Sequence, residues 1–405
     1  MTKAGFIVRN KFQIRHFDAL ASTFPSADYL LYKRKGLELE FSADELKSSQ
    51  LPVKFINRSN VVNVTSSYDV LFFQTAFPGI ELIDQTPLVS VQYGLAKERH
   101  NYGEWRALAD LNLMYGPYSA SAVSHYGPSV AIGNLKFCGW DYRLTPLQKE
   151  EAKRRLGLDH QIPVVLYMPT YGELGSFDEL VEPLAKLSDR YQILIKGHHN
   201  DEISGFQWMS KARALGHTHL FPGGFDQVRL LEVSDAVISD FSGAAFDAVY
   251  AQIPVILFQG GAEKKIGIQK FDLSSLEYRE RERIGRVCYD INSLEYALEE
   301  VLSAPEKFLN AVASLRDSLF EDVSSPSSAL LARNVVERLL AGDFPPRSKP
   351  QVYIRETIQR LLQVERELKL QSNKPIWQLL MMITTSISKF GSRLPSWIRS
   401  MSLFP

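Results

Sequence analysis

Cysteine is scarce in this 405-residue sequence, with only Cys138 and Cys288, which lie far apart along the chain. The pair provides neither a disulfide framework nor a metal-binding spacing, so we expect a reducing compartment and no metal site. No run reaches the ~20 apolar residues needed to cross a bilayer, and the start, MTKAGFIVRN, lacks the apolar core of a signal peptide. Basic and acidic residues number 46 each, which leaves no basic field to attract nucleic acid. These absences indicate a cytoplasmic globular protein.

Short apolar segments alternate with polar or helical ones, and this pattern occurs twice. The first series of strand candidates is AGFIVRN, YLLYK, VKFI, DVLFFQ, PLVSVQYG, LNLMYG and SVAIGN. After a charged helix with a glycine stop, TPLQKEEAKRRLGL, the second series is PVVLYMPT, YQILIKGHH, THLFPG, DAVISD and PVILFQ. Such alternation predicts an α/β fold with two parallel sheets covered by helices, in domains spanning 1–145 and 146–345. Ligands of such sheets bind outside the carboxyl ends of the strands, so we expect a site in the cleft between the domains.

The segment ISDFSGAAFD, residues 238–247, places hydroxyls, a carboxylate and a glycine between a strand and a run of small residues with helical character. Strand, turn, helix and strand form the unit of a parallel sheet. The free N–H groups and the dipole at a helix N-terminus favour an anion, and Ser242 and Gly243 would let a phosphate approach them. Capping of the helix by Ser242 or Asp240 explains the segment equally well. Both interpretations therefore remain open for this segment taken alone.

Two other strands of the second series end in groups that suit an anion. LYMPTYGE ends with the hydroxyl of Thr170, and ILIKGHHN ends with Lys196 and His198. A lysine suits a phosphate charge, and a histidine can exchange a proton or bind a phosphate oxygen. A lone histidine is more often structural, but three strand ends that point the same way predict a phosphate site.

The three motifs resemble, in order and spacing, those of the CDP-glycerol glycerophosphotransferase family, the teichoic-acid polymerases and primases. DAVISDFSGAAFDAVYAQIPVILF is similar to the family's ADVLITDYSSVMFDYANLDKPIIF, VVLYMPTYGE to ILYAPTYR, and ILIKGHH to LVIKPHP. The resemblance covers residues 163–258 and implies a GT-B fold, in which two Rossmann-like domains face a cleft and the second holds the nucleotide donor. It also implies that His198 binds a donor phosphate and that Ser242 and Asp240 contact the donor. The substrate-binding candidates in this domain are Thr170, Lys196, Ser239, Asp240, Ser242, Gly243 and Asp247.

The sequence departs from the family at the expected catalytic base. The family's WHGTPLK motif, whose histidine is implied to be the base, corresponds best to VQYGLAKE, which retains Gly94 and Lys97 but has Tyr93 in the place of the histidine. A tyrosine, with an unperturbed pKa near ~10, is a poor base at neutral pH. His100 can substitute if its loop folds back. The catalytic candidates are therefore His198, His100 and Tyr93, and Gly94 and Lys97 join the substrate-binding set.

The resemblance implies a transferase that moves a phosphoalditol unit from a CDP-linked donor to a hydroxyl of a lipid-linked or polymeric cell-envelope acceptor. One alternative is a GT-B glycosyltransferase that uses a nucleotide sugar for capsule or lipopolysaccharide synthesis. Another is a non-catalytic GT-B-like partner in an envelope-polymer assembly, which Tyr93 would explain. We expect no cofactor, and the sequence indicates no particular oligomeric state.

A proline-rich break, AGDFPPRSKP, precedes a tail that spans residues 346–405. The tail begins as a charged amphipathic helix, VYIRETIQRLLQVERELKLQ, and holds no acidic residue from Leu368 onward. Basic residues beside an apolar stripe predict a helix that lies on an anionic membrane surface. Docking on the protein itself or on a partner subunit is the alternative. The membrane interpretation would make the protein peripheral on the inner face of the cell membrane.

Overall fold

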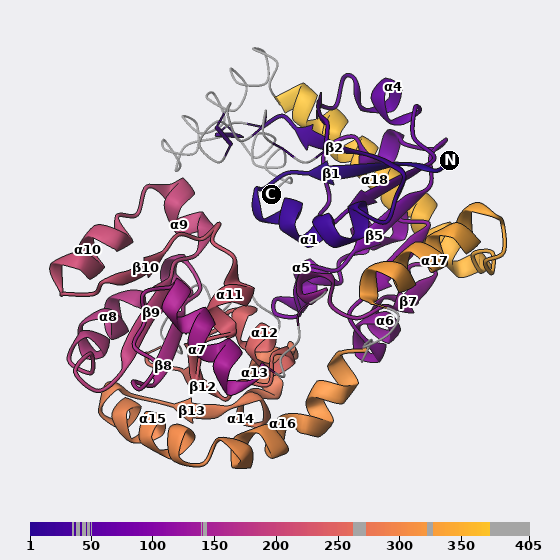
Figure 1. The fold of residues 1–405 in the computed structure, drawn as a ribbon. Helices are drawn as coiled ribbons and strands as arrows, with labels where there is room; N and C mark the ends of the chain where they lie inside the picture. The colour runs from indigo at the N-terminus through magenta and orange to yellow at the C-terminus, as the bar shows by residue number, and fades with distance from the viewer. Residues whose placement is uncertain are drawn as a thin grey trace, which may run out of the picture.

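The computed structural model describes residues 1–34, 36–37, 41–42, 46, 49, 51–138, 140, 144–261, 273–321 and 327–372. Its described part contains two parallel sheets in separate lobes (Figure 1). The first sheet has the order β3-β2-β1-β4-β5-β6-β7, and the second has the order β10-β9-β8-β11-β12-β13. In each sheet the chain first builds outward on one side and then on the other, so the strand order reverses between β1 and β4 and between β8 and β11.

Each strand of the first sheet overlaps a segment that the sequence predicts, although β1 and β2 begin before those segments. They are β1 Lys3–Val8, β2 Ser26–Tyr32, β3 Val53–Ile56, β4 Val70–Phe73, β5 Leu88–Val91, β6 Leu111–Met114 and β7 Ser129–Ala131. The connecting helices are α1 Phe12–Ala21, α4 Val61–Thr65, η1 Ile80–Leu82, α5 Glu98–Asn101, η2 Glu104–Leu108, α6 Pro117–Val123 and η3 Leu135–Phe137. Helices cover both faces of a parallel sheet, so its strands are nearly continuous apolar runs. The stacked rings of Phe6 and Phe72, 4.7 Å apart, lie in this core.

The second sheet holds the five predicted strands and a sixth. They are β8 Val164–Met168, β9 Gln192–Lys196, β10 His219–Phe221, β11 Ala236–Ser239, β12 Val255–Phe258 and β13 Arg286–Cys288. Its helices are α7 Pro146–Arg155, η4 Gly172–Leu174, α8 Phe177–Ala185, α9 His199–Ser204, α10 Trp208–Ala214, α11 Gln227–Leu231, α12 Ala244–Tyr250, α13 Leu276–Arg279, α14 Arg281–Ile284, η7 Ile291–Ser293, α15 Leu294–Ser303 and α16 Pro305–Leu319. The sequence does not predict β13, because RVC is short and follows the charged segment RERERIG.

The last helices return to the first lobe. Helix α17, Ser328–Leu340, buries Ala332 and Val336 in the core of the first sheet. Helix α18, Lys349–Ser372, lies against the same lobe, where Arg355 forms an ion pair with Asp110. The predicted second domain extends to residue 345 and so includes α17, whereas the structure packs α17 against α1 and the core of the first sheet. Figure 1 shows the chain crossing between the lobes through α16.

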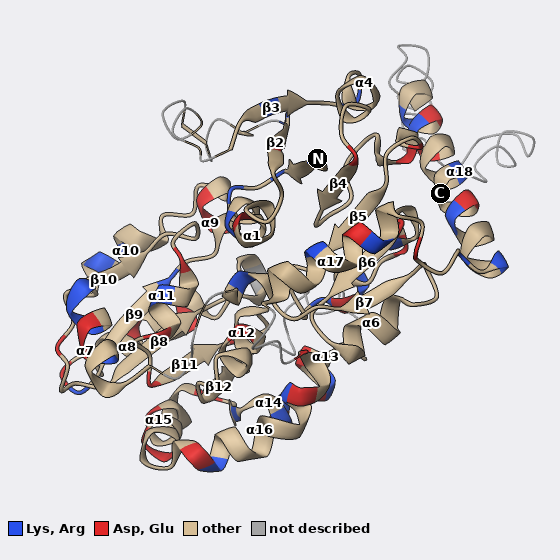
Figure 2. Cartoon of the chain, turned by 45° about the vertical axis from the view of Figure 1, so that its right-hand side comes forward, with Lys and Arg blue, Asp and Glu red and all other residues tan. Residues whose placement is uncertain are grey.

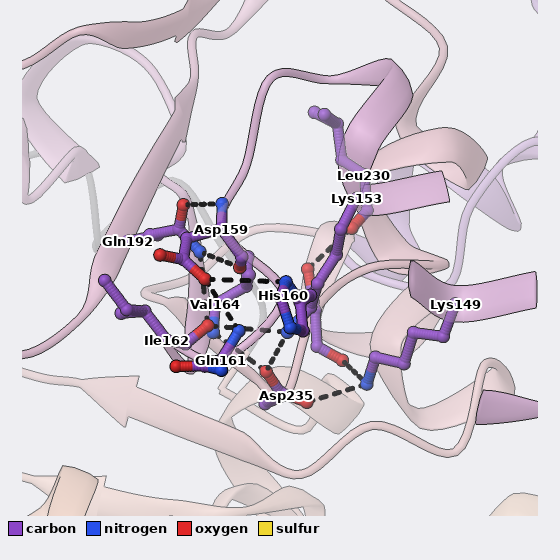
Figure 3. A network of polar contacts seen from close by, with 11 residues as sticks. Lys149, Lys153, Asp159, His160, Gln161, Ile162, Val164, Gln192, Leu230 and Asp235 are labelled. Carbon is purple, nitrogen blue, oxygen red and sulfur yellow. Dashed lines mark hydrogen bonds and ion pairs between the residues drawn. The ribbon is translucent and has the colours of Figure 1, made fainter. Parts of the chain in front are cut away.

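An ion-pair network joins α7 to the amino ends of the strands in the second sheet (Figure 3). The Asp235 carboxylate, just before β11, accepts hydrogen bonds from Lys149 Nζ at 2.7 Å and from the backbone N–H of Val164 at 2.8 Å. Lys153 Nζ lies 3.5 Å from the same carboxylate. This network lies at the end of the sheet opposite to the carboxyl ends of the strands, so it fixes the fold and leaves the other end for ligands.

Of the helices in the described ranges, none combines the length and the apolar character required to cross a membrane.

Candidate functional site

A cavity of about 450 Å³ lies between the two lobes and is lined by residues of both. Its walls come from the segments that follow β1, β4 and β5 in the first sheet and β8, β9, β10 and β11 in the second. The cavity therefore touches the points where the strand order of each sheet reverses, which is where open α/β sheets bind ligands. The predicted site residues that line it are Tyr93, Gly94, Lys97, His100, Lys196, His198, Ser242, Gly243 and Asp247.

The charges on the cavity wall favour an anionic ligand. Among the described lining residues, the cations are Arg9, Arg15, Lys97, Lys136 and Lys196, and the carboxylates are Asp226 and Asp247. Both carboxylates are paired, since Asp226 lies 3.5 Å from Arg15 and Asp247 forms an ion pair with Lys136. The remaining positive charge is suited to phosphate groups.

His198 precedes α9 and presents one defined nitrogen to the cavity. Its Nδ1 accepts a hydrogen bond from the backbone N–H of Asn200 at 3.1 Å, so the neutral ring carries its hydrogen on Nε2. Burial, followed by the neighbouring His199 and Lys97, lowers the pKa of His198 well below its usual value. The ring stacks on His199 at 4.3 Å between ring centres. A neutral imidazole fixed in this way can donate an Nε2–H hydrogen bond to a phosphate oxygen.

Lys196 closes β9 and lies beside a glycine turn. Its Nζ donates to the Gly223 carbonyl at 2.8 Å. Burial lowers its pKa to about 8, because the surroundings disfavour the charged form. An anion in the cavity would favour the ammonium form, so phosphate and proton binding at Lys196 are coupled.

The residues of the SDFSG segment have two different roles: some line the cavity, and others hold a neighbouring loop. Ser242 lines the cavity, and its Oγ accepts a hydrogen bond from the Ala244 N–H at 3.3 Å, at the start of α12. Asp240 is 2% exposed, and its carboxylate accepts hydrogen bonds from Thr170 N–H at 2.8 Å and from Ser176 N–H and Oγ at 2.9 Å. Ser239 is fully buried and donates to the Met168 carbonyl at 2.8 Å. Asp240 and Ser239 therefore hold the loop after β8 in place, and neither lines the cavity.

Thr170 also lies behind the cavity wall, 2% exposed. Its Oγ1 lies 3.4 Å from Lys97 Nζ, across the boundary between the lobes. The backbone of Lys97 makes a second contact with the second lobe. It adopts a left-handed conformation (φ 61°), and its N–H donates a hydrogen bond to Glu277 Oε1 at 2.7 Å. Lys97 thus connects the first lobe to two segments of the second.

Tyr93 and His100 lie side by side on the first-lobe wall, with ring centres 6.2 Å apart. The structure therefore brings His100 to the cavity, as the sequence required for it to replace the missing histidine. Burial raises the pKa of Tyr93 to about 12, which makes the phenol a poor base. Burial and the nearby Lys97 lower the pKa of His100.

Several lining residues were not predicted from sequence. Lys136 forms its buried ion pair with Asp247, which also accepts a hydrogen bond from Gln227 at 2.7 Å. The other residues missed include Arg9, Asn10, Phe12, Arg15, His16, Gly223, Gly224 and Phe225. Those that follow β1 and β10 could have been found by applying the strand-end rule to these two strands as well.

The comparisons with known proteins agree with this geometry. Residues 142–337 match the family model described as CDP-Glycerol:Poly(glycerophosphate) glycerophosphotransferase. That range contains the cavity loops after β8, β9, β10 and β11. A search of curated proteins finds no match.

Solved structures share the fold at low sequence identity. The wall teichoic acid polymerase TagF is 14% identical, with a TM-score of 0.59 over 85% of this chain and 90% of that chain. A TagF variant soaked with CDPG is 15% identical, with a TM-score of 0.56 over 88% of this chain and 90% of that chain. HepE of Anabaena, in complex with UDP-glucose, is 14% identical, with a TM-score of 0.50 over 84% of this chain and 100% of that chain.

These likenesses confirm the GT-B-like fold expected from the sequence. The resemblance read from three short motifs is also confirmed, since the protein is a two-lobed α/β chain whose residues 142–337 match the CDP-glycerol glycerophosphotransferase family.

Proposed function

We propose that the protein transfers a phosphoalditol unit of the glycerophosphate type from a CDP-linked donor to a hydroxyl of a lipid-linked or polymeric cell-envelope acceptor. The observation that carries this proposal is the cationic cavity at the reversal points of both sheets, whose second-lobe loops belong to the family-matched range. The TagF variant soaked with CDPG supports a CDP-linked donor.

The donor's phosphates would lie against the second lobe. His198 would donate its Nε2–H to a phosphate oxygen, and Lys196 would supply a charge. Ser242 and the backbone at Gly243 would face the same group at the start of α12, where the helix has free N–H donors. Asp247 would act through Lys136, by holding the ammonium group at the cavity wall. Gly94 and Lys97 would form the opposite wall.

The reaction would be a displacement at phosphorus. The acceptor oxygen attacks the β-phosphorus of the donor, the bond to the α-phosphate oxygen breaks, and CMP leaves with the bonding electron pair. The cations fixed at the cavity wall offset the charge that develops on the phosphoryl oxygens. A base must take the proton of the acceptor hydroxyl, and Tyr93 would hold its own proton too tightly to do so.

A nucleotide-sugar glycosyltransferase is the second candidate, because HepE has the same fold and was solved with UDP-glucose. Such an enzyme would use the same phosphate-facing loops, but the acceptor would attack carbon. A non-catalytic partner in an envelope-polymer assembly would keep the loops and transfer no group.

Donor binding and transfer together separate these candidates. Calorimetric titration with CDP-glycerol, CDP-ribitol and UDP-glucose should show selective binding of a CDP-alditol, and mass spectrometry should then detect CMP and an acceptor extended by one phosphoalditol unit. We expect His198→Ala to abolish transfer and Ser242→Ala to weaken donor binding by about 1–3 kcal/mol, the contribution of a hydrogen bond to a charged group.

The exposed His125, which lies outside the cavity lining, provides the matched control His125→Ala, with wild-type binding expected. Selective binding of UDP-glucose would favour the glycosyltransferase, and binding without turnover would favour the non-catalytic partner. Wild-type affinity and turnover in both cavity variants would contradict the phosphate role of these loops.

A further inference from the structure

His16, on α1, lies on the first-lobe wall of the cavity and is held by one specific contact. Its Nδ1 lies 3.3 Å from the side-chain carbonyl oxygen Oε1 of Gln74, which follows β4 and is 1% exposed. A carbonyl oxygen can only accept a hydrogen bond, so Nδ1 must carry the hydrogen. Neutral His16 therefore keeps its lone pair on Nε2. This arrangement is the opposite of that in His198, whose lone pair is engaged and whose hydrogen is on Nε2.

The position of His16 in the fold is that of a ligand-facing group. The segment from β1 to α1 and the residue after β4 flank the point where the strand order of the first sheet reverses, and ligands bind there in such sheets. Phe12 contacts both His16 and the second-lobe wall, with its ring centre 5.1 Å from that of His16 and 4.9 Å from that of His199. Phe12 therefore links His16 to the loop after β9, which carries His198 and His199.

The surroundings of His16 favour its neutral form. Burial, followed by the neighbouring Lys136, lowers its pKa well below the usual value, and Lys196 and His199 act in the same direction. The Gln74 hydrogen bond acts in the other direction. Donor phosphates would offset these cations, so donor binding should make His16 more basic when a proton has to be accepted.

The two groups that the sequence offered as the base fit less well. Burial raises the pKa of Tyr93 to about 12, so its phenol keeps its proton. His100 lines the cavity, but within the described part of the chain no hydrogen bond to its imidazole fixes the tautomer. A general base is normally oriented by a third group, and His16 has such a group in Gln74.

We propose that His16 is the general base of the transfer reaction and that Gln74 is the residue that positions it. Nε2 of His16 takes the proton from the acceptor hydroxyl as its oxygen attacks the β-phosphorus, CMP leaves with the electron pair of the broken P–O bond, and the imidazolium releases its proton to solvent before the next cycle. This assignment rests on the proposed function and adds to it the acceptor side of the site.

The tautomer can be measured without any substrate. Long-range ¹H–¹⁵N spectra of protein labelled with ¹⁵N-histidine should show a neutral His16 ring with a protonated Nδ1 and an unprotonated Nε2, assigned by its loss in His16→Gln. Gln74→Met removes the acceptor and should shift the ring toward the other tautomer. An unprotonated Nδ1 in the wild type would overturn the proposal.

Kinetics with CDP-glycerol test the role itself. His16→Gln should lower kcat by about 100-fold or more, the usual contribution of a general base, while the Kd for CDP-glycerol changes by no more than about threefold, because a base for the acceptor contributes little to donor binding. His125→Gln is the matched control. Gln74→Glu should move the acidic limb of the kcat–pH profile to higher pH, because a carboxylate stabilises the imidazolium and the base is active only when unprotonated. A purely structural glutamine would not move this limb.

The possible failures differ from one another. If the wild type binds CDP-glycerol and transfers, but His16→Gln keeps kcat within about threefold of wild type, His16 is not the base and the proposed function stands. If His100→Gln alone loses turnover, the base is His100. If the wild type neither binds nor transfers any CDP-alditol, the proposed function fails and the role of His16 fails with it.

Discussion

The histidines and carboxylates of the site show that residue type alone does not decide a role. His16 and His198 line the same cavity, but their hydrogen bonds at Nδ1 have opposite directions. As a result, Nε2 of neutral His16 carries a lone pair, whereas Nε2 of neutral His198 carries the hydrogen. Asp240 and Asp247 belong to the same motif, and the structure uses the first to clamp a loop and the second to hold Lys136. The sequence identified His198, Asp240 and Asp247 as site candidates but did not reveal their hydrogen-bond or ion-pair partners. It did not identify His16.

Glu277 is a buried carboxyl whose titration should be visible in stability. Burial raises its pKa from 4.5 to about 7. Because the folded state then binds the proton more tightly than the unfolded state, its contribution is fully present below pH 4.5 and is lost as the pH rises through 7. The shift corresponds to about 3 kcal/mol at most. Glu277→Gln, which keeps an acceptor for Lys97 N–H, should be more stable than wild type at pH 8 and lose this advantage at pH 4.5.

Urea unfolding of both proteins at the two pH values measures this difference. The exposed Glu299 provides the matched control Glu299→Gln, with no comparable dependence on pH expected. Equal midpoints for wild type and Glu277→Gln at pH 8 would show that Glu277 is not held in a raised-pKa environment.

Strands were more predictable than the packing of the last helices. Each predicted apolar segment became a strand, because a strand covered on both faces must be apolar throughout. The position of α17 depends on which lobe its apolar face packs against. That contact involves residues far away in the sequence, so the sequence of the helix alone does not predict it. The donor loops were found because their motifs lie within one lobe. His16 and Lys136 join them only through the arrangement of the two lobes.

The junction between α7 and the second sheet depends on Asp235 (Figure 3). Burial acts to raise its pKa, but Lys149, the Val164 N–H and Lys153 together hold it below the usual value. A depressed pKa stabilises the fold above about pH 3.8, and this stabilisation is lost as the pH falls through the folded-state pKa. Asp235→Asn should therefore lower the free energy of unfolding at pH 7 by about 1–3 kcal/mol, with the difference shrinking toward pH 3.5.

Asp159, in the same network, is the matched control for this change. Its side chain is 52% exposed, so Asp159→Asn should cost much less. Equal losses in the two variants, measured from urea midpoints, would mean that α7 is not held through Asp235.

The two lobes are joined by contacts that surround the cavity. Lys97 N–H donates to Glu277 of the second lobe, and Leu276 N–H donates in return to Glu98 of the first at 3.1 Å. The buried pair of Lys136 and Asp247 crosses the boundary at another point, and α16 and α17 link the lobes covalently. The cavity is thus bounded by residues whose positions depend on both lobes, which explains why a site inferred from short sequence motifs was incomplete.

The tail determines how the molecule would meet a lipid-linked acceptor. Helix α18 carries charges of both signs along the first lobe (Figure 2), and Ile358 and Leu362 pack against that lobe. Its last turns leave Leu361, Val364, Leu368 and Leu370 more than half exposed. The predicted membrane segment continues beyond them into residues 373–405, which lie outside the described residues. Because α18 is part of the folded lobe, a truncation that tests the tail must keep the chain through Ser372.

Removal of residues 373–405 should release the protein from anionic vesicles and leave CDP-glycerol binding unchanged. This segment contains Lys374, Lys389, Arg393 and Arg399, no acidic residue, and Trp377 and Trp397. Near an anionic surface each basic residue contributes about 1 kcal/mol, which salt weakens, and apolar burial in the headgroup region adds to it. Co-sedimentation with vesicles should therefore fall at high salt, on neutral lipid, and in a full-length variant with these four basic residues changed to glutamine.

Attachment would hold the cavity near a lipid-linked acceptor and raise its effective concentration, so truncation should slow transfer to a membrane-borne acceptor more than to a soluble one. Vesicle binding that does not depend on lipid charge and persists after truncation would contradict membrane attachment through this segment. A change in oligomeric state on truncation would identify the tail as a subunit contact instead.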